Sequence, residues 1–297
     1  MSRRSTLLGM VALLAALATP AAARTKDPEP LPQRDTRLIA AAVDALPAQR
    51  SGTIDLYALG FAGDGSQDVF RNEIAYFPQL MRQRLQARGV ITLINHLDSV
   101  QPAPHPLATY ENLQQALAGI AKRMDPDEDI LLLYLTMHGT PEHELAVYFP
   151  PFVEDALIAE DLRTVLDDAG IRHRVLVISA CYSGGFIREL RDPDTLLITA
   201  ARADRASFGC DSESNVTWFG RAWLVEGLNQ ENDLLQAYEY ATRRVHAWEQ
   251  AEKVEASFPQ MAAGKRIRQR LRQWQAQSPL GEAVAYPYPI EDLDAKP

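Results

Sequence analysis

The chain has 297 residues and a formal net charge of −9 at pH 7. An acidic chain of this kind disfavours nucleic-acid binding, which normally requires a basic face. Its two cysteines, Cys181 and Cys210, are too few for a disulfide scaffold, although they could pair with each other in an oxidising compartment. The length suits one large α/β domain or two small ones.

Residues 1–23 have the three parts of a secretory signal peptide. Arg3 and Arg4 form a basic start, residues 7–18 are apolar, and residues 19–23 offer a small-residue cleavage site. The apolar part is too short to span a membrane, and no later apolar run is long enough to do so. We therefore expect an exported protein, periplasmic or secreted, that uses the general secretory route or, given its paired arginines, the twin-arginine route.

Strand and helix patterns alternate through the rest of the chain. Residues 24–50 begin as a Pro-rich linker and continue into a short helix at about 35–46. The predicted strands are residues 53–61, 90–95, 130–137, 174–180 and 195–201, and the predicted helices are 73–88, 107–124, 156–169, 218–229 and 231–253. This alternation predicts an α/β fold with a mostly parallel sheet and helices on both faces. For residues 263–297 we expect the end of a helix and an irregular tail.

Two of these strands end in reactive side chains. The apolar residues 130–137 lead directly to His138, and the apolar residues 175–180 lead to Cys181. Continuously apolar strands are buried on both faces, and a single right-handed crossover places their carboxyl ends at the same edge of the sheet. A thiol beside an imidazole suggests nucleophilic catalysis in which the histidine moves the proton.

A family resemblance follows from these residues. His138-Gly139 after one strand and Ser179-Ala180-Cys181 after the next resemble the caspase-like cysteine peptidases, and within them the legumain (asparaginyl endopeptidase) family. The residues Tyr182-Ser183-Gly184-Gly185, the strand at 198–201 and the glycine-containing loop at 62–65 extend the similarity. The resemblance covers about residues 53–230. It implies a caspase-like three-layer sandwich, with residues 51–262 as the peptidase domain.

The resemblance also implies roles for individual residues. Cys181 would be the nucleophile, His138 the general acid/base, and the backbone amides of Gly139 and Cys181 the oxyanion hole. The implied substrate is a peptide or protein, and neither a metal nor another cofactor is expected. The family has an orienting asparagine early in the chain, and here Asp64 is the candidate for that role.

The residues that would line the substrate pocket are less tightly specified. Legumains have an acidic residue two positions before the catalytic cysteine, and here that position is Ser179. Strict asparagine specificity is therefore in question. Arg71, Asp211 and Glu213 are candidates for a polar pocket, and they are equally compatible with ordinary surface charges.

Three alternatives remain open at this point. Residues 181–185 loosely resemble the G-x-S-x-G nucleophile elbow, so a serine hydrolase that uses Ser183 is one of them. A non-catalytic member of the fold that binds peptides or a partner protein is another. A third is an acyl transferase that passes the acyl group to an amine, which would make the reaction a transamidation. A zinc site formed by His138 and His143 is disfavoured, because Gly139 and Pro141 prevent a continuous helix between them.

Overall fold

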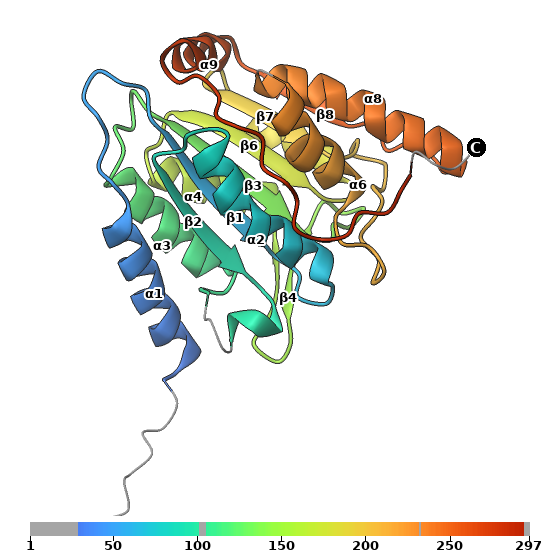
Figure 1. Ribbon diagram of the computed structural model, residues 1–297. Helices are drawn as coiled ribbons and strands as arrows, with labels where there is room; N and C mark the ends of the chain where they lie inside the picture. Colours follow the sequence, from blue (N-terminus) through green and yellow to red (C-terminus); the bar gives the residue numbers. More distant parts are fainter. Residues whose placement is uncertain (1–28, 101–104, 232, 294–297) are drawn as a thin grey trace, which may run out of the picture.

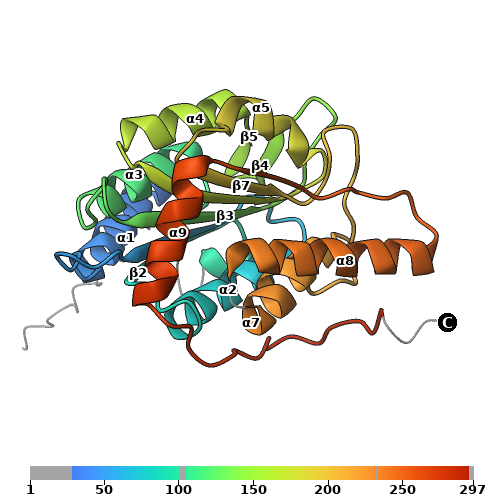
Figure 2. The same ribbon diagram turned by 90° about the horizontal axis from the view of Figure 1, so that it is seen from above.

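The computed structural model describes residues 29–100, 105–231 and 233–293. The predicted signal peptide therefore lies outside the described residues. A central sheet is covered by helices on both faces, which gives the three layers seen in Figures 1 and 2. The prediction of an α/β fold with a mostly parallel sheet is confirmed.

The main sheet has six strands in the order β2-β1-β3-β6-β7-β8. Their bounds are β1 Leu56–Ala62, β2 Gly89–Ile94, β3 Ile130–Thr136, β6 His173–Ser179, β7 Thr195–Thr199 and β8 Gln260–Ala263. All neighbouring strands are parallel except β8, which runs antiparallel to β7. A separate antiparallel hairpin, β4 (Leu145–Phe149) and β5 (Val153–Leu157), lies between β3 and β6 in the chain.

Alternate side chains of the central strands enter two different cores. In β3, Ile130, Leu132 and Tyr134 belong to one hydrophobic cluster, and the residues between them, such as Leu131 and Leu133, belong to the other. Every residue of β1, β3 and β6 is buried. This two-sided burial explains why the strands are apolar without alternation.

The helices divide between the two faces of the sheet (Figure 2). One face carries α1 (Leu31–Ala45), α3 (Tyr110–Ala121), α4 (Ala159–Asp168) and α5 (Ile187–Leu190). The other carries α2 (Asp68–Gln83), the helical segment α6 (Trp218–Gly220) to α7 (Leu228–Gln230), α8 (Leu234–Glu252) and α9 (Lys265–Gln277). A π-helical stretch, Arg221–Gly227, joins α6 to α7. Within the described ranges, none of these helices has both the length and the apolar character that a membrane span requires.

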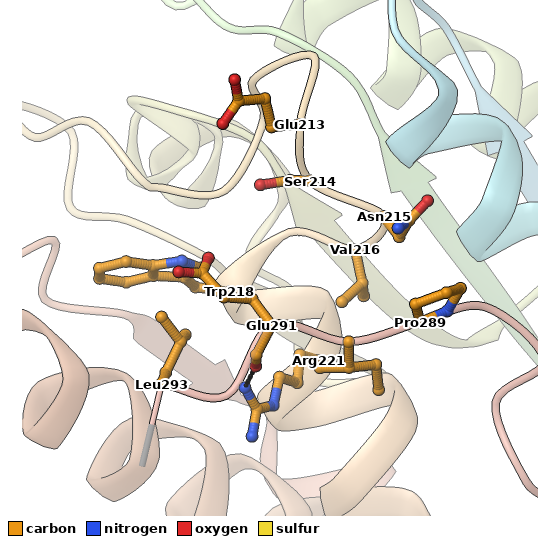
Figure 3. A pocket seen from close by; sticks show the side chains of 10 residues that line it. Glu213, Ser214, Asn215, Val216, Trp218, Arg221, Pro289, Glu291 and Leu293 are labelled. Carbon is orange, nitrogen blue, oxygen red and sulfur yellow. Dashed lines mark hydrogen bonds between the residues drawn. The ribbon is translucent and has the colours of Figure 1, made fainter. Parts of the chain in front are cut away.

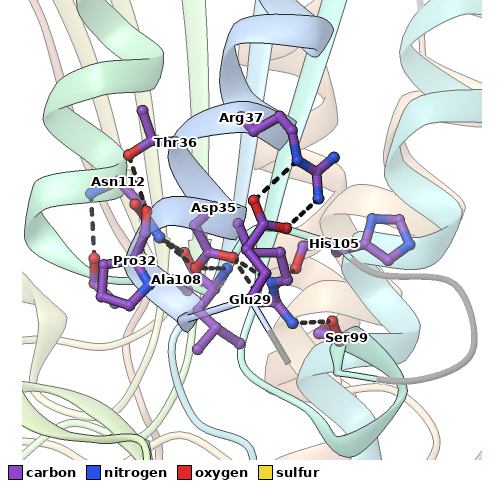
Figure 4. Close-up of polar contacts among 12 residues, drawn as sticks. Glu29, Pro32, Asp35, Thr36, Arg37, Ser99, His105, Ala108 and Asn112 are labelled. Atoms are coloured by element: carbon purple, nitrogen blue, oxygen red, sulfur yellow. Dashed lines mark hydrogen bonds and ion pairs between the residues drawn. The ribbon is translucent and has the colours of Figure 1, made fainter. Parts of the chain in front are cut away.

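Helix α1 is longer and more firmly attached than a linker with a short helix would be. Its buried Asp35 carboxylate accepts hydrogen bonds from the amide of Leu107 at 3.0 Å and from the side chain of Asn112 at 2.9 Å (Figure 4). The neighbouring Arg34 binds Asp35 and the carbonyl oxygen of Ser99. These contacts join α1 to α3 and to the loop before it, so residues 31–45 are part of the folded domain.

The C-terminal part of the chain is also more ordered than predicted. Residues 260–263 form the edge strand β8, and residues 265–277 form α9, whose Ile267, Leu271 and Trp274 are buried. Residues 265–277 are thus helical over their whole length, and the expected irregular tail is limited to the residues after α9. The segment after α9 runs back along the α2 side of the molecule (Figures 1 and 2).

Candidate active site

The register of two strands brings His138 and Cys181 together. Thr136 of β3 is paired with Ser179 of β6, and each reactive residue lies two positions beyond its paired residue. Hydrogen-bonded strands are roughly 4.8 Å apart, so the two residues leave the sheet side by side at its carboxyl edge. The arrangement expected from the two apolar runs is present. The imidazole and the thiol are both half-buried.

Gly139 packs directly against the backbone of Cys181. A Cβ atom at position 139 would lie 2.2 Å from the carbonyl oxygen of Cys181, so only glycine permits this approach. Among the described residues, no acceptor receives a backbone hydrogen bond from the amide of Gly139 or of Cys181. Two amides are thus available beside the thiol, as an oxyanion hole requires.

The ring of His138 is held by two residues from the start of α2. Its Nε2 lies 2.5 Å from Oε1 of Gln67. The ring of Phe70 meets the imidazole edge-on, with the ring centroids 5.1 Å apart and an angle of 85° between the planes. An amide oxygen only accepts hydrogen bonds, so Nε2 carries the proton and Nδ1 is the nitrogen left to exchange a proton with a reactant.

Sequence reasoning did not find Gln67. The predicted helix begins at residue 73, whereas α2 begins at Asp68, so Gln67 falls between the predicted loop at 62–65 and the predicted helix. Its position immediately before a helix that begins near the end of β1 is the signal that could have identified it, because that position lies at the reactive edge of the sheet.

The sulfur of Cys181 contacts Ser207 through three polar atoms. The amide of Ser207 donates to Sγ at 3.2 Å, the thiol can donate to the Ser207 carbonyl oxygen at 3.5 Å, and the Ser207 hydroxyl lies 3.6 Å away. The contact from Cys210 is the largest influence on the Cys181 thiol, and it lowers the pKa of Cys181. Burial opposes this effect, and the Ser207 contacts and the charge of His138 add to it. In return, the pKa of Cys210 is raised, because its proton is held by the neighbouring sulfur.

The backbone conformation of Tyr182, the residue after Cys181, determines the direction in which the chain leaves the thiol. Tyr182 has φ 56° and ψ 12°, the left-handed region that a residue with a side chain rarely adopts. Its amide donates to the carbonyl oxygen of Arg205 at 2.8 Å. The sharp turn separates β6 from the short helix that follows it, and Cys181 stands at its start. Strained conformations of this kind cluster at functional sites.

Asp64 does not orient His138. Its carboxylate is buried and accepts hydrogen bonds from the amide and the hydroxyl of Ser66, at 2.8 and 2.5 Å. The residue also forms a β-bridge with Tyr148 of β4. Its carboxylate therefore stabilises the turn after β1, and the partner of the imidazole is Gln67 instead.

Ser179 points into the protein rather than into an open pocket. It is 2% exposed, and its hydroxyl lies 3.1 Å from that of Thr217. Beside it is Glu73 of α2, whose carboxylate accepts from the Tyr134 hydroxyl at 2.7 Å and from the Thr217 amide at 2.8 Å. Complete burial raises the pKa of Glu73. This network attaches α2 to the start of α6.

The other three pocket candidates lie near these elements, with Arg71 half-buried and Asp211 and Glu213 exposed. Arg71 of α2 is paired with Asp68 at 3.4 Å. Asp211 is exposed, and its carboxylate accepts from the amides of Glu213 and Ser214, which closes a local turn. The structure thus gives Asp211 a local role in its loop and does not connect it with His138 or Cys181.

Glu213 lies at the rim of a small cavity between residues 213–218 and the C-terminal segment (Figure 3). The cavity has a volume of about 40 Å³, which is room for water and too little for a substrate side chain. Its far side is formed by Arg221, which donates to the carbonyl oxygen of Glu291 at 2.7 Å. The cavity therefore belongs to the packing of the C-terminal segment.

The serine alternative conflicts with the geometry. Ser183 is fully buried, and its hydroxyl donates to the carbonyl oxygen of Ala180 at 2.7 Å and accepts from the amide of Ala201. A hydroxyl in this position holds the turn together and is closed to substrate. His143 is engaged elsewhere, with Nε2 3.0 Å from the carbonyl oxygen of Ala203.

Comparison with known protein families decides the classification. The model of the Peptidase C13 family matches residues 111–269, more than half of the chain. The chain belongs to the peptidase C13 family. The resemblance to legumains, the caspase-like fold and the assignment as a cysteine peptidase, a hydrolase of proteins, are thereby confirmed. No curated protein matches the chain in a sequence search. The matched range contains His138 and Cys181, whereas Gln67 lies before it.

Proposed function

We propose that this C13 peptidase is an exported endopeptidase that cleaves peptide bonds through an acyl-enzyme on Cys181, with His138 as general acid/base. The observation that carries the proposal is the register of β3 and β6, which makes the imidazole and the thiol neighbours, with Gly139 against the Cys181 backbone. The leader-like residues 1–23 support export. The substrate is a peptide or protein.

In the acylation step, the Cys181 thiolate attacks the carbonyl carbon of the scissile bond. The lowered pKa makes this thiolate available near neutral pH. Negative charge develops on the carbonyl oxygen, and the amides of Gly139 and Cys181 stabilise it. His138 takes the proton of the Cys181 thiol at Nδ1 as the thiolate forms, and it then donates this proton to the leaving amine, which departs and leaves a thioester on Cys181.

In the second step, His138 accepts a proton from water at the same nitrogen, and the resulting hydroxide attacks the thioester. Gln67 is a positioning residue in both steps. By accepting from Nε2–H, it keeps the tautomer in which Nδ1 faces the reaction. The same acyl-enzyme would yield a new amide if an amine replaced water, so transamidation is a variant of this mechanism.

The substrate specificity of this peptidase differs from the strict preference for asparagine beside the scissile bond. A neutral hydroxyl, Ser179, stands where legumains carry an acidic group, and it is bonded to Thr217. The nearby acidic group, Glu73, is enclosed and already accepts two hydrogen bonds. A pocket built on these residues lacks the free carboxylate that would pair with a side-chain amide.

The test is a peptide-library cleavage assay on the purified full chain and on its Cys181→Ala variant. Wild-type protein should cleave some library members, iodoacetamide should abolish the cleavage, and Cys181→Ala should be inactive. A fluorophosphonate, which labels reactive serines, should have no effect. Equal inactivity of both proteins on every peptide would favour a non-catalytic binding protein, and loss of activity with the fluorophosphonate alone would favour a serine hydrolase.

A further inference from the structure

Under the proposed function, the substrate has one direction across the reactive edge of the sheet. His138, after β3, gives a proton to the leaving amine, so the peptide that follows the scissile bond lies on the β3 side of Cys181. The acyl part, which precedes the scissile bond, then extends the other way. It crosses the ends of β7 and β8, which follow β6 in the sheet.

An exposed aromatic side chain, Phe258, lies on this path. Ile178, Thr199 and Gln260 are level with one another across β6, β7 and β8. Because β8 is antiparallel to β7, the residues before Gln260 leave the sheet at the same edge as those after Ile178. Phe258 and Cys181 thus lie two and three residues beyond this row. They are separated across the sheet by two strand spacings, about 10 Å, which an extended peptide covers in about three residues.

The backbone is anchored on both sides of Phe258. Ser257 is buried, and its carbonyl oxygen accepts from the amide of Arg202 at 2.8 Å. The carbonyl oxygen of Pro259 accepts from the hydroxyl of Tyr238 at 2.8 Å. Between these anchors Phe258 has φ 53°, in the left-handed region, and it is 44% exposed. Both features cost folding free energy, and strained residues of this kind cluster at functional sites.

Phe258 and Arg202 together form a rigid platform. The guanidinium of Arg202 lies over the Phe258 ring, with Cζ 4.8 Å from the ring centroid. The same guanidinium donates to both carboxylate oxygens of Asp204, at 2.5 and 3.0 Å. The two opposite charges balance, so the platform presents an aromatic surface without a net charge. The loop that continues from Asp204 reaches the Cys181 sulfur through the amide of Ser207.

We infer that Phe258 and Arg202 form a substrate subsite that binds an apolar side chain three or four residues before the scissile bond. The distance from Cys181 gives this position, and only one of the two residues faces the platform, because side chains alternate along an extended peptide. The occupant is apolar, since it covers exposed ring surface and the Arg202–Asp204 pair leaves no charge to select an ionic group. The subsite rests on the proposed function, because the role of His138 sets the direction of the peptide.

Peptide pairs test the subsite by kinetics on the full chain. They are based on the library member that the wild type cleaves best, with phenylalanine or alanine at the third or the fourth residue before the scissile bond. In the wild type, phenylalanine at one of these positions should raise kcat/KM about tenfold over alanine. In Phe258→Gly this ratio should fall to near one. Phe258→Tyr, which keeps the ring, should retain most of it, and Val254→Ala, an exposed residue of the same segment, should retain all of it.

Urea denaturation of Phe258→Gly separates a substrate contact from a merely structural one. Glycine adopts the left-handed conformation without strain, so this variant should lose little stability. A ring that served only to cover Arg202 would give the opposite pair of results, with a less stable variant and an unchanged ratio between the peptides.

Peptide binding to Cys181→Ala distinguishes failure of the subsite from failure of the proposed function. Library members captured by this variant should be enriched in apolar residues, and adding Phe258→Gly should remove the enrichment. A wild type that cleaves no peptide would overturn the proposed function, whereas this binding measurement would still decide the subsite. The subsite is overturned if the wild-type ratio is near one at both positions, if Phe258→Gly keeps the wild-type ratio, or if both Cys181→Ala proteins capture the same peptides.

Discussion

The Oε1 atom of Gln67 lies 2.5 Å from Nε2 of His138. Gln67 immediately precedes the first residue of α2, and its side chain does not cap that helix. It reaches across the carboxyl edge of the sheet to the imidazole instead. The start of α2 thus determines the tautomer of a residue that belongs to a different strand–loop unit.

Replacement of Gln67 by alanine should slow the chemical step. The ring of His138 would lose the acceptor for Nε2–H, although Phe70 would still contact it. We expect kcat to fall by roughly tenfold to a hundredfold, equivalent to about 1.4–2.7 kcal/mol, with KM little changed. Steady-state kinetics on a cleaved peptide would measure this, and Gln79→Ala, an exposed glutamine of the same helix, is the matched control.

Gln67→Glu separates a positioning role from a merely structural one. A carboxylate also accepts from Nε2–H, so part of the kcat lost in the alanine variant should return. An alanine variant with wild-type kcat, or a glutamate variant that recovers none of the lost kcat, would contradict the assigned role.

Gly139→Ala should damage the oxyanion site while leaving the nucleophile in place. The added Cβ would meet the Cys181 carbonyl oxygen at 2.2 Å, so one backbone must shift. The loss of one aligned donor typically reduces kcat by about a hundredfold to a thousandfold. Iodoacetamide should still label Cys181, which a labelling assay would measure. Circular dichroism would check that the variant is folded. Thr140→Ser, at the next position, should keep near-normal activity.

The reactivity of Cys181 should depend on pH in a way that reports its neighbour. The Cys210 hydrogen bond lowers the pKa of Cys181. The rate of alkylation by iodoacetamide should therefore rise with a midpoint below the usual value of about 8.5 for a free cysteine. In Cys210→Ala the contact that lowers the pKa of Cys181 is lost, whereas burial still raises it. The midpoint of the alkylation rate should therefore move to higher pH. Identical midpoints in the two proteins would count against the thiol contact.

Glu73 should contribute to stability through the acceptors that it provides. In Glu73→Ala the Tyr134 hydroxyl and the Thr217 amide would be buried without this partner, and a cavity would remain. We expect a loss of roughly 2–4 kcal/mol in the free energy of unfolding, measured by urea denaturation. Glu73→Gln keeps one acceptor oxygen and should lose less.

The difference in stability between the wild type and Glu73→Gln should depend on pH. Because the pKa of Glu73 is raised in the folded state, the protonated acid is favoured by folding. Its contribution is greatest below the ordinary carboxyl range and declines as pH rises toward the raised pKa. Glu73→Gln does not titrate, so its stability relative to wild type should improve with rising pH over this range. A constant difference across pH would contradict the assignment.

The reactive edge of the sheet is predictable from sequence because it follows from local rules. Two continuously apolar strands, one intervening helix and the handedness of crossovers place His138 and Cys181 together. The register of β3 and β6 shows this directly. No remote information is needed, since each residue is defined by where its own strand ends.

The hydrophobic patterns of the sequence did not predict contacts between residues that are far apart in the chain. Ser207 reaches the Cys181 sulfur from an irregular loop whose path depends on Gly209 and on packing around Trp218. Strand β8 is short and half-buried, so it has no apolar run to reveal it. Helix α9 is rich in arginine and glutamine, and its buried stripe of three residues is narrow. Residues 153–157 were predicted partly as helix, although they pair with β4.

The conformation of Tyr182 lowers the stability of the fold but positions the catalytic thiol. A left-handed conformation costs a residue with a side chain about 1–2 kcal/mol relative to glycine. A search for stabilising substitutions would therefore favour glycine at this position. The same change would loosen the turn that holds the Cys181 sulfur between His138 and the segment 207–210. Engineering for shelf life and engineering for turnover would select opposite residues at position 182.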